Sequence, residues 1–240
     1  MPGFTSYLYL ARLGLIHPSL MVLTWKIKRT KRTYLSYATL YSLARGFKQV
    51  KARHAELVQV AEFGVGRGGS ALLLAWLVAR YGGRLTLFDV FGRIPAPTPI
   101  DGERAQRRYT GILTQESQEY YGNMPDLLDV VTHELREVCE PGRIVFVQGR
   151  YEDTLPQRAS GEAFNLVHID CDWYESSMVV YNYLREHLAR KSIIQVDDYS
   201  DWEGSRRAFS DAVWLHQYHT HLIDGALVID TVRDKQGKLI

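Results

Sequence analysis

A glycine-rich turn between two apolar segments limits the fold of this chain more than any other feature. Residues 57–63 are mostly apolar, residues 64–70 read Gly-Val-Gly-Arg-Gly-Gly-Ser, and residues 71–78 are almost continuously apolar. This order predicts a strand, a tight turn and a buried helix. The spacing of the glycines, G-x-G-x-x-G, matches the fingerprint of dinucleotide-binding folds, in which a ligand approaches the N–H groups at a helix start. Because glycine turns end many other strands, the match alone is weak.

The rest of the chain alternates between short β-rich runs and helical segments. Further strands are predicted at residues 84–89, 144–147, 164–169, 192–196 and 226–232, with helices at 175–189 and 206–216. Strands that alternate with helices are typical of a parallel sheet with helices on both faces. We therefore expect an α/β fold with a doubly wound, mostly parallel sheet.

Length and composition indicate one large domain with a full hydrophobic core. The chain has 240 residues, of which 46% are apolar and 23% charged. Its two cysteines, Cys139 and Cys171, cannot form a disulfide framework. No apolar stretch supplies the roughly 20 residues that a membrane span needs. Because no secretory signal opens the sequence, the expected localisation is cytoplasmic.

The basic residues are concentrated at the N-terminus. Residues 1–55 hold ten Lys or Arg and no Asp or Glu, although the whole chain carries only +2. Such a split can indicate a nucleic-acid or membrane contact, or an arm that packs on its own acidic body or on a neighbouring subunit. Since no aromatic stacking pattern is interleaved with these charges and their density is modest, we favour the packed arm and expect no nucleic-acid partner. We predict a basic helical arm or lid over residues 1–56 and a main domain over residues 57–240.

A long insertion separates the second and third predicted strands. About fifty residues, roughly 92–142, occupy a connection that usually needs a dozen or more. The segment is polar and contains Tyr109, Tyr120 and Tyr121. We interpret it as a helical lid or as a contact in a homo-oligomer, a dimer or higher.

Polar residues gather where the predicted strands end. In doubly wound sheets, ligands bind beyond the carboxyl ends of the strands. The residues at these ends are Gly64, Asp89, Tyr151, Asp170, Asp172, Asp197 and Asp198. Four aspartates on adjacent strand ends require a cation or raised pKa values, and an all-oxygen ligand set favours Mg²⁺, Mn²⁺ or Ca²⁺ over zinc. Some of the four could instead cap helices, as Asp172 and Asp198 are placed to do.

The glycine turn suits two cofactors, NAD(P) and S-adenosylmethionine. Asp89 stands at the position that binds a ribose in either case. Glu62, just before the turn, favours S-adenosylmethionine because a carboxylate repels a pyrophosphate and attracts an ammonium group. The Tyr-x-x-x-Lys pair of short-chain dehydrogenases does not occur. An NAD(P)-dependent oxidoreductase and a non-catalytic cofactor-binding scaffold protein remain the alternatives.

The same residues resemble the macrocin-type sugar O-methyltransferases, which are metal-dependent enzymes of macrolide and aminocoumarin biosynthesis. The resemblance runs from about residue 33 to residue 208. It is carried by the segments Glu-Phe-Gly-Val-Gly-Arg-Gly-Gly-Ser (62–70), Phe-Asp (88–89), Asp-Thr-Leu-Pro (153–156), His-Ile-Asp-Cys-Asp-Trp-Tyr-Glu-Ser (168–176) and Asp-Asp-Tyr-x-x-Trp-x-Gly (197–204). It implies a Rossmann-like class I methyltransferase with a mostly parallel seven-stranded sheet, which methylates a hydroxyl of a sugar or glycosylated natural product.

The resemblance also implies a role for individual residues. Asp172 corresponds to the general base, and a Mg²⁺ or Mn²⁺ ion would be held by Asp170, Asp197 and Asp198. The S-adenosylmethionine site would comprise Thr33, Leu35, Glu62, Gly64, Gly66, Ser70, Asp89 and Tyr151. The expected partner is a small-molecule sugar or glycoside that accepts the methyl group. His168, by contrast, is expected to be a packed core residue.

Overall fold

A seven-stranded sheet forms the centre of the computed structural model, which describes residues 4–54, 56–114, 124, 126–158 and 161–239. The strands are β1 (Val58–Phe63), β2 (Gly83–Asp89), β3 (Ile144–Gln148), β4 (Phe164–Ile169), β5 (Leu188–Val196), β6 (Tyr218–Ile223) and β7 (Ala226–Asp234). Their order in the sheet is β3-β2-β1-β4-β5-β7-β6. The first five run parallel, and β7 is antiparallel to β5 and β6. The predicted fold class is therefore confirmed.

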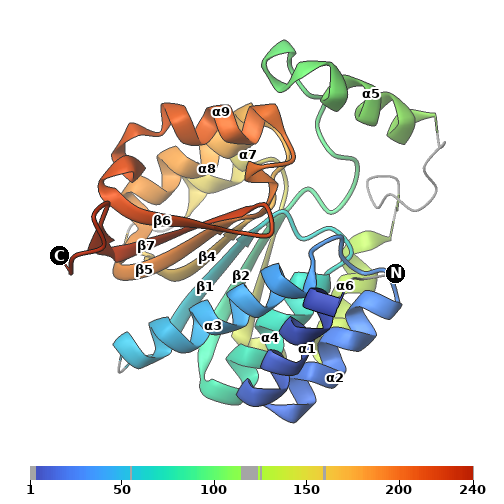
Figure 1. Cartoon of the computed structure of the whole chain (residues 1–240). Helices are drawn as coiled ribbons and strands as arrows, with labels where there is room; N and C mark the ends of the chain where they lie inside the picture. Colours follow the sequence, from blue (N-terminus) through green and yellow to red (C-terminus); the bar gives the residue numbers. More distant parts are fainter. Residues whose placement is uncertain (1–3, 55, 115–123, 125, 159–160, 240) are drawn as a thin grey trace.

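Helices cover both faces of the sheet (Figure 1). One face carries α1 (Phe4–Ile16), α2 (Pro18–Arg29), α3 (Tyr37–Arg53), α4 (Gly69–Tyr81) and α6 (Leu127–Arg136). The other carries α7 (Tyr151–Thr154), α8 (Tyr174–His187) and α9 (Glu203–Asp211). Each layer has its own hydrophobic cluster against the sheet, so the strand residues are buried from both sides.

The basic N-terminal helices share the core of the main domain. Leu13, Leu20 and Ile27 of α1 and α2 are fully or almost fully buried in the same cluster as β1 and α4. Two basic side chains also pair with acidic residues of the body: Arg32 with Glu134, and Arg53 with Asp230 through two hydrogen bonds of 2.8 Å. The basic segment thus packs on its own body. Among the described residues, no helix is long and apolar enough to cross a membrane.

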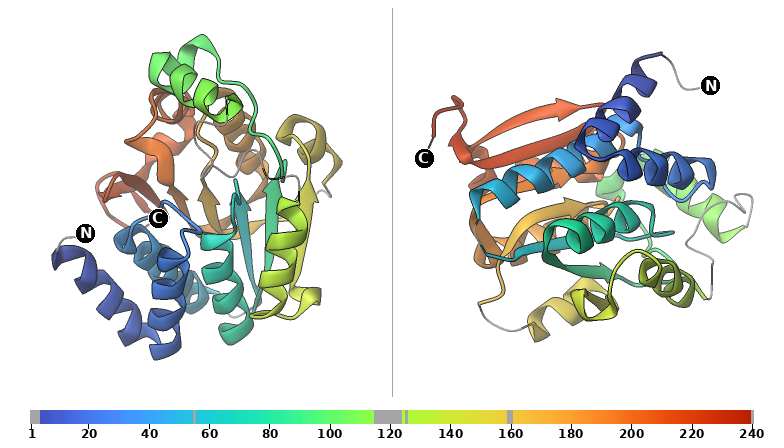
Figure 2. Two further views of the ribbon diagram at one scale, coloured as in Figure 1. Left: turned by 90° about the vertical axis from the view of Figure 1, so that its right-hand side faces the viewer. Right: turned by 90° about the horizontal axis from the view of Figure 1, so that it is seen from below.

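The long insertion divides into two parts with different surroundings. Helix α6 packs on α4 through buried Leu127, Val131 and Leu135. Helix α5 (Gly102–Leu113) instead projects beyond the sheet, at the end of the molecule opposite α1 and α2 (Figure 2, left). Tyr109 lies in α5, while Tyr120 and Tyr121 fall outside the described residues. Among the described residues of the insertion, only α5 is placed like a lid.

Candidate active site

The glycine turn is fixed by the backbone of the neighbouring strand. Gly64 has a φ of 86°, and a Cβ at this position would lie 1.8 Å from the carbonyl oxygen of Asp170. Only glycine fits such a close approach with a left-handed backbone. The Asp170 N–H donates to Phe63 O at 2.8 Å, and Gly64 N–H donates to Phe88 O at 2.9 Å. The turn after β1 is therefore joined directly to the carboxylate segment after β4.

Asp89 is the last residue of β2, and its carboxylate stabilises this turn through hydrogen bonds. Its Oδ2 accepts hydrogen bonds from the N–H groups of Val65 (2.6 Å) and Gly66 (3.1 Å). Its Oδ1 accepts one from Phe91 N–H at 2.7 Å. Burial raises the pKa of the carboxyl, while these three donors counteract that rise. A carboxylate oxygen can accept further bonds, so Asp89 can hold the turn and still meet a hydroxyl in the hollow that it lines.

Four aspartates stand together at the ends of β4 and β5, as predicted from their positions. Asp172 N–H donates to Asp198 Oδ2 at 2.9 Å, and the carboxyls of Asp170 and Asp198 are close enough to affect each other's pKa. Asp197 Oδ1 is buried and has no hydrogen-bond partner among the described residues. Desolvation, reinforced by the neighbouring carboxylates, raises the pKa of all four side chains, for Asp197 to about 7. A cation bound among these carboxyls would lower their pKa values, because a nearby positive charge favours the ionised form.

The structure does not group these side chains as a ready metal site. In the described part of the chain, no three His, Cys, Asp or Glu side chains are arranged so that they could hold an ion. The donor chemistry nevertheless suits a hard divalent cation, because every candidate ligand is a carboxylate oxygen.

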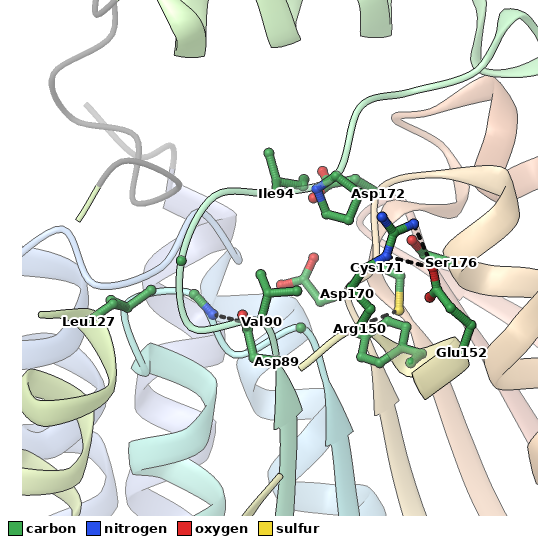
Figure 3. Close-up of a pocket in the computed structure, with 15 residues that line it drawn as sticks. Asp89, Val90, Ile94, Leu127, Arg150, Glu152, Asp170, Cys171, Asp172 and Ser176 are labelled. Carbon is green, nitrogen blue, oxygen red and sulfur yellow. Dashed lines mark hydrogen bonds and ion pairs between the residues drawn. The ribbon is translucent and has the colours of Figure 1, made fainter. Parts of the chain in front are cut away.

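Two hollows meet at Asp170 and Asp172. The first, which we call the glycine-side hollow, has an empty volume of about 680 Å³ and is lined by Gly64, Gly66, Asp89, Val90, Gly92, Ile94, Pro95, Leu127, Arg150, Tyr151, Glu152, Asp170, Cys171, Asp172 and Ser176. Figure 3 shows the Asp170 side chain between Asp89 and Cys171 in this hollow. Its walls are the segments that follow β1 to β4, at the carboxyl ends of the strands, where a ligand is expected.

The second, the arginine-side hollow, is larger, with an empty volume of about 1340 Å³. It is lined by Tyr34, Leu35, Ser36, Thr39, Arg104, Arg107, Arg108, Asp170, Asp172, Asp197, Asp198, Asp201, Trp202 and Asp224. All four clustered aspartates face it, opposite the arginines of α5. Since Asp170 and Asp172 belong to both linings, a group bound in one hollow lies beside a group bound in the other.

The predicted cofactor residues fall into two groups. Gly64, Gly66, Asp89 and Tyr151 line the glycine-side hollow. Glu62, Ser70 and Thr33 line neither hollow, and Leu35 lines the arginine-side one. Glu62 is fully buried, and its Oε1 is 2.9 Å from Nδ1 of His168, which is equally buried in the core. Thr33 lies against the start of α4, where a Cβ on Gly69 would come within 2.7 Å of its own Cβ.

A lysine of α2 fixes the turn that contains Thr33 and Leu35. Lys28 Nζ donates to the carbonyl oxygens of Thr33, Tyr34 and Leu35 at 3.3, 3.3 and 2.6 Å. Burial lowers the pKa of Lys28, and Asp197 partly offsets this. Sequence reasoning missed this lysine because its partners are backbone carbonyls, which no side-chain motif records.

Sequence reasoning also missed the wall formed by α5. Asp101 is 1% exposed; its Oδ1 accepts from Tyr174 N–H at 2.6 Å, and its Oδ2 accepts from Thr98 N–H at 2.7 Å. Arg104 Nη1 donates to Asp201 O at 2.8 Å and stacks 4.8 Å from the Trp202 ring. The contacts of Asp101 with Tyr174 and of Arg104 with Asp201 join residues 73 and 97 positions apart in the chain. The only available signal was the basic cluster at residues 104–108, which alone indicates a solvated helix face.

The family model of the macrocin O-methyltransferases matches residues 37–229. The chain belongs to this family. It is an S-adenosylmethionine-dependent O-methyltransferase, and the oxidoreductase and scaffold alternatives are set aside. No curated protein sequence matches the chain significantly.

Solved methyltransferase structures share the fold. The O-methyltransferase NovP gives a TM-score of 0.70 at 19% identity, over 84% of this chain and 83% of NovP. The calicheamicin methyltransferase CalS11 gives 0.66 at 20% identity, over 96% and 94%. PaMTH1 of Podospora anserina, solved with S-adenosylhomocysteine, gives 0.56 at 14% identity, over 88% and 87%. At these identities, the similarity supports the fold and not the choice of acceptor.

Proposed function

We propose that this macrocin-family enzyme methylates a sugar hydroxyl, with Asp172 as the general base and a divalent cation held by Asp170, Asp197 and Asp198. The observation that carries the proposal is the position of Asp170 and Asp172 in the linings of both hollows. A methyl donor in one hollow and a hydroxyl in the other would be adjacent at these carboxylates. Such positioning can supply a large part of the rate enhancement.

The glycine-side hollow is the proposed site of the methyl donor. Its polar lining residues Asp89 and Tyr151 and its glycine turn suit the ribose and the amino-acid part of S-adenosylmethionine. Bound there, this cofactor supplies an electrophilic methyl group. Glu62 does not line the glycine-side hollow. It would contribute to the donor site through its buried contact with His168, which would hold β1 and the glycine turn in place.

The aspartate cluster supports the cation on two grounds. Its ligands are all carboxylates, and Asp197 Oδ1 is buried with no hydrogen-bond partner in the part of the chain that the structure describes. A divalent cation, preferably Mg²⁺ or Mn²⁺, would supply positive charge that favours ionisation of an acceptor hydroxyl. Asp170 and Asp198 would hold the cation in their ionised form, since carboxyl groups must be deprotonated to act as ligands.

Asp172 is suited to accept the hydroxyl proton. Burial and the neighbouring Asp198 raise the pKa of its carboxyl well above the usual value, and a hydrogen bond from Trp202 partly offsets the rise. A raised pKa makes a carboxylate a stronger base. The backbone of Asp172 has a φ of 59°, which lets its N–H reach Asp198 while its side chain faces the hollows.

The sugar acceptor is supported by the family and by one of its structural neighbours. CalS11 is described as a TDP-rhamnose 3′-O-methyltransferase of calicheamicin biosynthesis. The arginine-side hollow is large and polar, as a hydroxyl-rich acceptor requires.

The proposal is tested by methyl transfer from labelled S-adenosylmethionine to a set of sugars, glycosides and nucleotide sugars. Activity should need Mg²⁺ or Mn²⁺ and vanish with EDTA. Asp197→Asn should raise the metal concentration needed for half-maximal activity, with partial recovery at excess metal, whereas Asp224→Asn, in the same hollow, should not. Full activity in EDTA would refute the metal part of the proposal.

A further inference from the structure

Helix α5 presents a row of positive charge to the arginine-side hollow. Arg104, Arg107 and Arg108 are spaced i, i+3 and i+4, which places them on one face of the helix, and all three line the hollow. The aspartates that form the proposed catalytic centre line the same hollow. The hollow therefore has an acidic floor at the strand ends and a basic wall on α5.

The basic wall is held in a defined place. Asp101, just before α5, is anchored to the start of α8 through Tyr174 N–H, and Gly204 of α9 lies so close that a Cβ there would be 1.8 Å from Asp101 Oδ1. Trp173 Nε1 also donates to Pro95 O at 2.9 Å. The first turn of α5 is thus tied to two helices of the body, so its arginines have a fixed relation to the aspartates.

The contacts of the first two arginines leave their charge available to a ligand. Arg104 contacts a carbonyl oxygen and an aromatic ring, neither of which carries a negative charge. Arg107 pairs with Glu103 at 3.1 Å, but both side chains are largely exposed, at 72% and 92%. Exposed pairs of this kind contribute little and exchange readily. Arg108 acts on Asp172, the proposed general base: its positive charge lowers the pKa of that carboxyl.

From this arrangement we propose that the acceptor is a sugar that still carries a diphosphate, as in a nucleoside diphosphate sugar, and that Arg104 and Arg107 bind the diphosphate. The inference rests on the proposed function and names its substrate class. Guanidinium groups bind phosphate oxygens with two parallel hydrogen bonds, which suits two adjacent phosphates along one helix face. The sugar would then extend from the basic wall to the aspartates. The enzyme would act before the sugar is transferred, so its product would be a substrate for a glycosyl-transfer reaction.

A different role for the arginines makes different predictions. If the arginines only balance the negative charge of the aspartates, removing one arginine should change the electrostatics of the aspartate cluster. The affinity for a diphosphate should then stay unchanged. If a cation on the aspartates holds the diphosphate instead, Asp197→Asn should abolish diphosphate binding and the arginine variants should not.

The experiment is calorimetric titration of the full chain, loaded with S-adenosylhomocysteine, with dTDP, dTMP, thymidine and pyrophosphate, each in Mg²⁺ and in EDTA. We expect dTDP and pyrophosphate to bind and thymidine to bind at least tenfold more weakly than dTDP. Arg107→Ala should weaken dTDP binding about tenfold, and the Arg104→Ala/Arg107→Ala double variant about a hundredfold, as the loss of charge-assisted hydrogen bonds predicts. Arg107→Lys should lose less, because it keeps the charge. The arginine effects should be the same with and without metal.

Arg80→Ala, an exposed arginine in the last turn of α4, is the matched control and should bind dTDP like the wild type. Equal dTDP affinity in the wild type and the double variant would overturn the inference. So would equal binding of thymidine and dTDP. Failure of the proposed function has a separate signature, which is no methyl transfer to nucleotide sugars or to neutral glycosides despite intact S-adenosylhomocysteine binding. Methylation of neutral glycosides at the same kcat/KM by wild type and double variant would leave the proposed function standing and refute the inference alone.

Discussion

The two hollows of the active site share Asp170 and Asp172 but are built in different ways. The glycine-side hollow is shaped by turns that directly follow four parallel strands, and backbone N–H groups satisfy the carboxylate of Asp89. The arginine-side hollow is assembled from charged side chains of segments far apart in the chain, held by single contacts such as Tyr174 N–H to Asp101. The glycine-side hollow is therefore shaped mainly by the backbone, and the arginine-side hollow mainly by side chains.

The difference indicates which hollow can change without loss of the fold. A backbone-built site fits a cofactor common to many enzymes, because its shape depends on the sheet itself. A site built from side chains on connecting segments can be altered by few substitutions, which suits recognition of a particular acceptor. Substitutions in the two hollows should therefore separate donor binding from acceptor binding, with turnover lost at the carboxylates that they share.

The largest effect is expected where the hollows meet. Asp172→Asn should lower turnover by about 10²–10⁴-fold, because an amide cannot accept the hydroxyl proton. Asparagine tolerates the left-handed backbone at this position, so the fold should be kept. Binding of S-adenosylhomocysteine should not change. The measurement is methyl transfer from labelled donor to the best acceptor in the set.

Asp224→Asn is the matched control for this substitution. Asp224 lines the arginine-side hollow and also has a left-handed backbone, with a φ of 48°. Its substitution should leave turnover close to that of the wild type. An Asp172→Asn enzyme as active as this control would exclude Asp172 as the base.

The next effect tests the glycine-side hollow alone. Asp89→Asn should weaken S-adenosylhomocysteine binding about 10- to 100-fold, since the substitution puts an amide group among the N–H donors of Val65, Gly66 and Phe91. Affinity for dTDP in the other hollow should stay unchanged. Calorimetry with both ligands measures the two affinities, and Asp129→Asn, exposed on α6, is the control. A parallel loss of both affinities would mean that the hollows are not independent.

The sequence predicted the backbone-built side of this comparison and little of the other. The strand ends, the glycine turn and the four aspartates follow from local patterns, and the sheet brings them together because parallel strands end at one edge. Strand β6 and the position of α5 do not follow from such patterns. Strand β6 is partly exposed along its length and reads Tyr-His-Thr-His-Leu-Ile, with two histidines among its first four residues. The place of α5 depends on the Asp101 contacts with α8 and α9, which no local pattern encodes.

The smallest effect concerns that long-range contact. A Cβ on Gly204 would lie 1.8 Å from Asp101 Oδ1 and 2.9 Å from Tyr174 N, so Gly204→Ala must push Asp101 from its bond and shift the start of α5. Overpacking of this kind costs about 1–3 kcal/mol of unfolding free energy. Gly111, inside α5, has no described neighbour within 4 Å of an added Cβ. Gly111→Ala should therefore stabilise the chain by about 0.5–1 kcal/mol, because it removes the conformational freedom of a helical glycine.

Urea unfolding of both variants measures these changes, and acceptor KM tells whether the wall has moved. Gly204→Ala should raise acceptor KM while S-adenosylhomocysteine affinity stays the same, and Gly111→Ala should change neither. If Gly204→Ala lost stability with no change in acceptor KM, the contact between α9 and Asp101 would support the fold alone. The arginine-side hollow would then keep its shape without this contact, contrary to the view that its wall depends on single side-chain contacts.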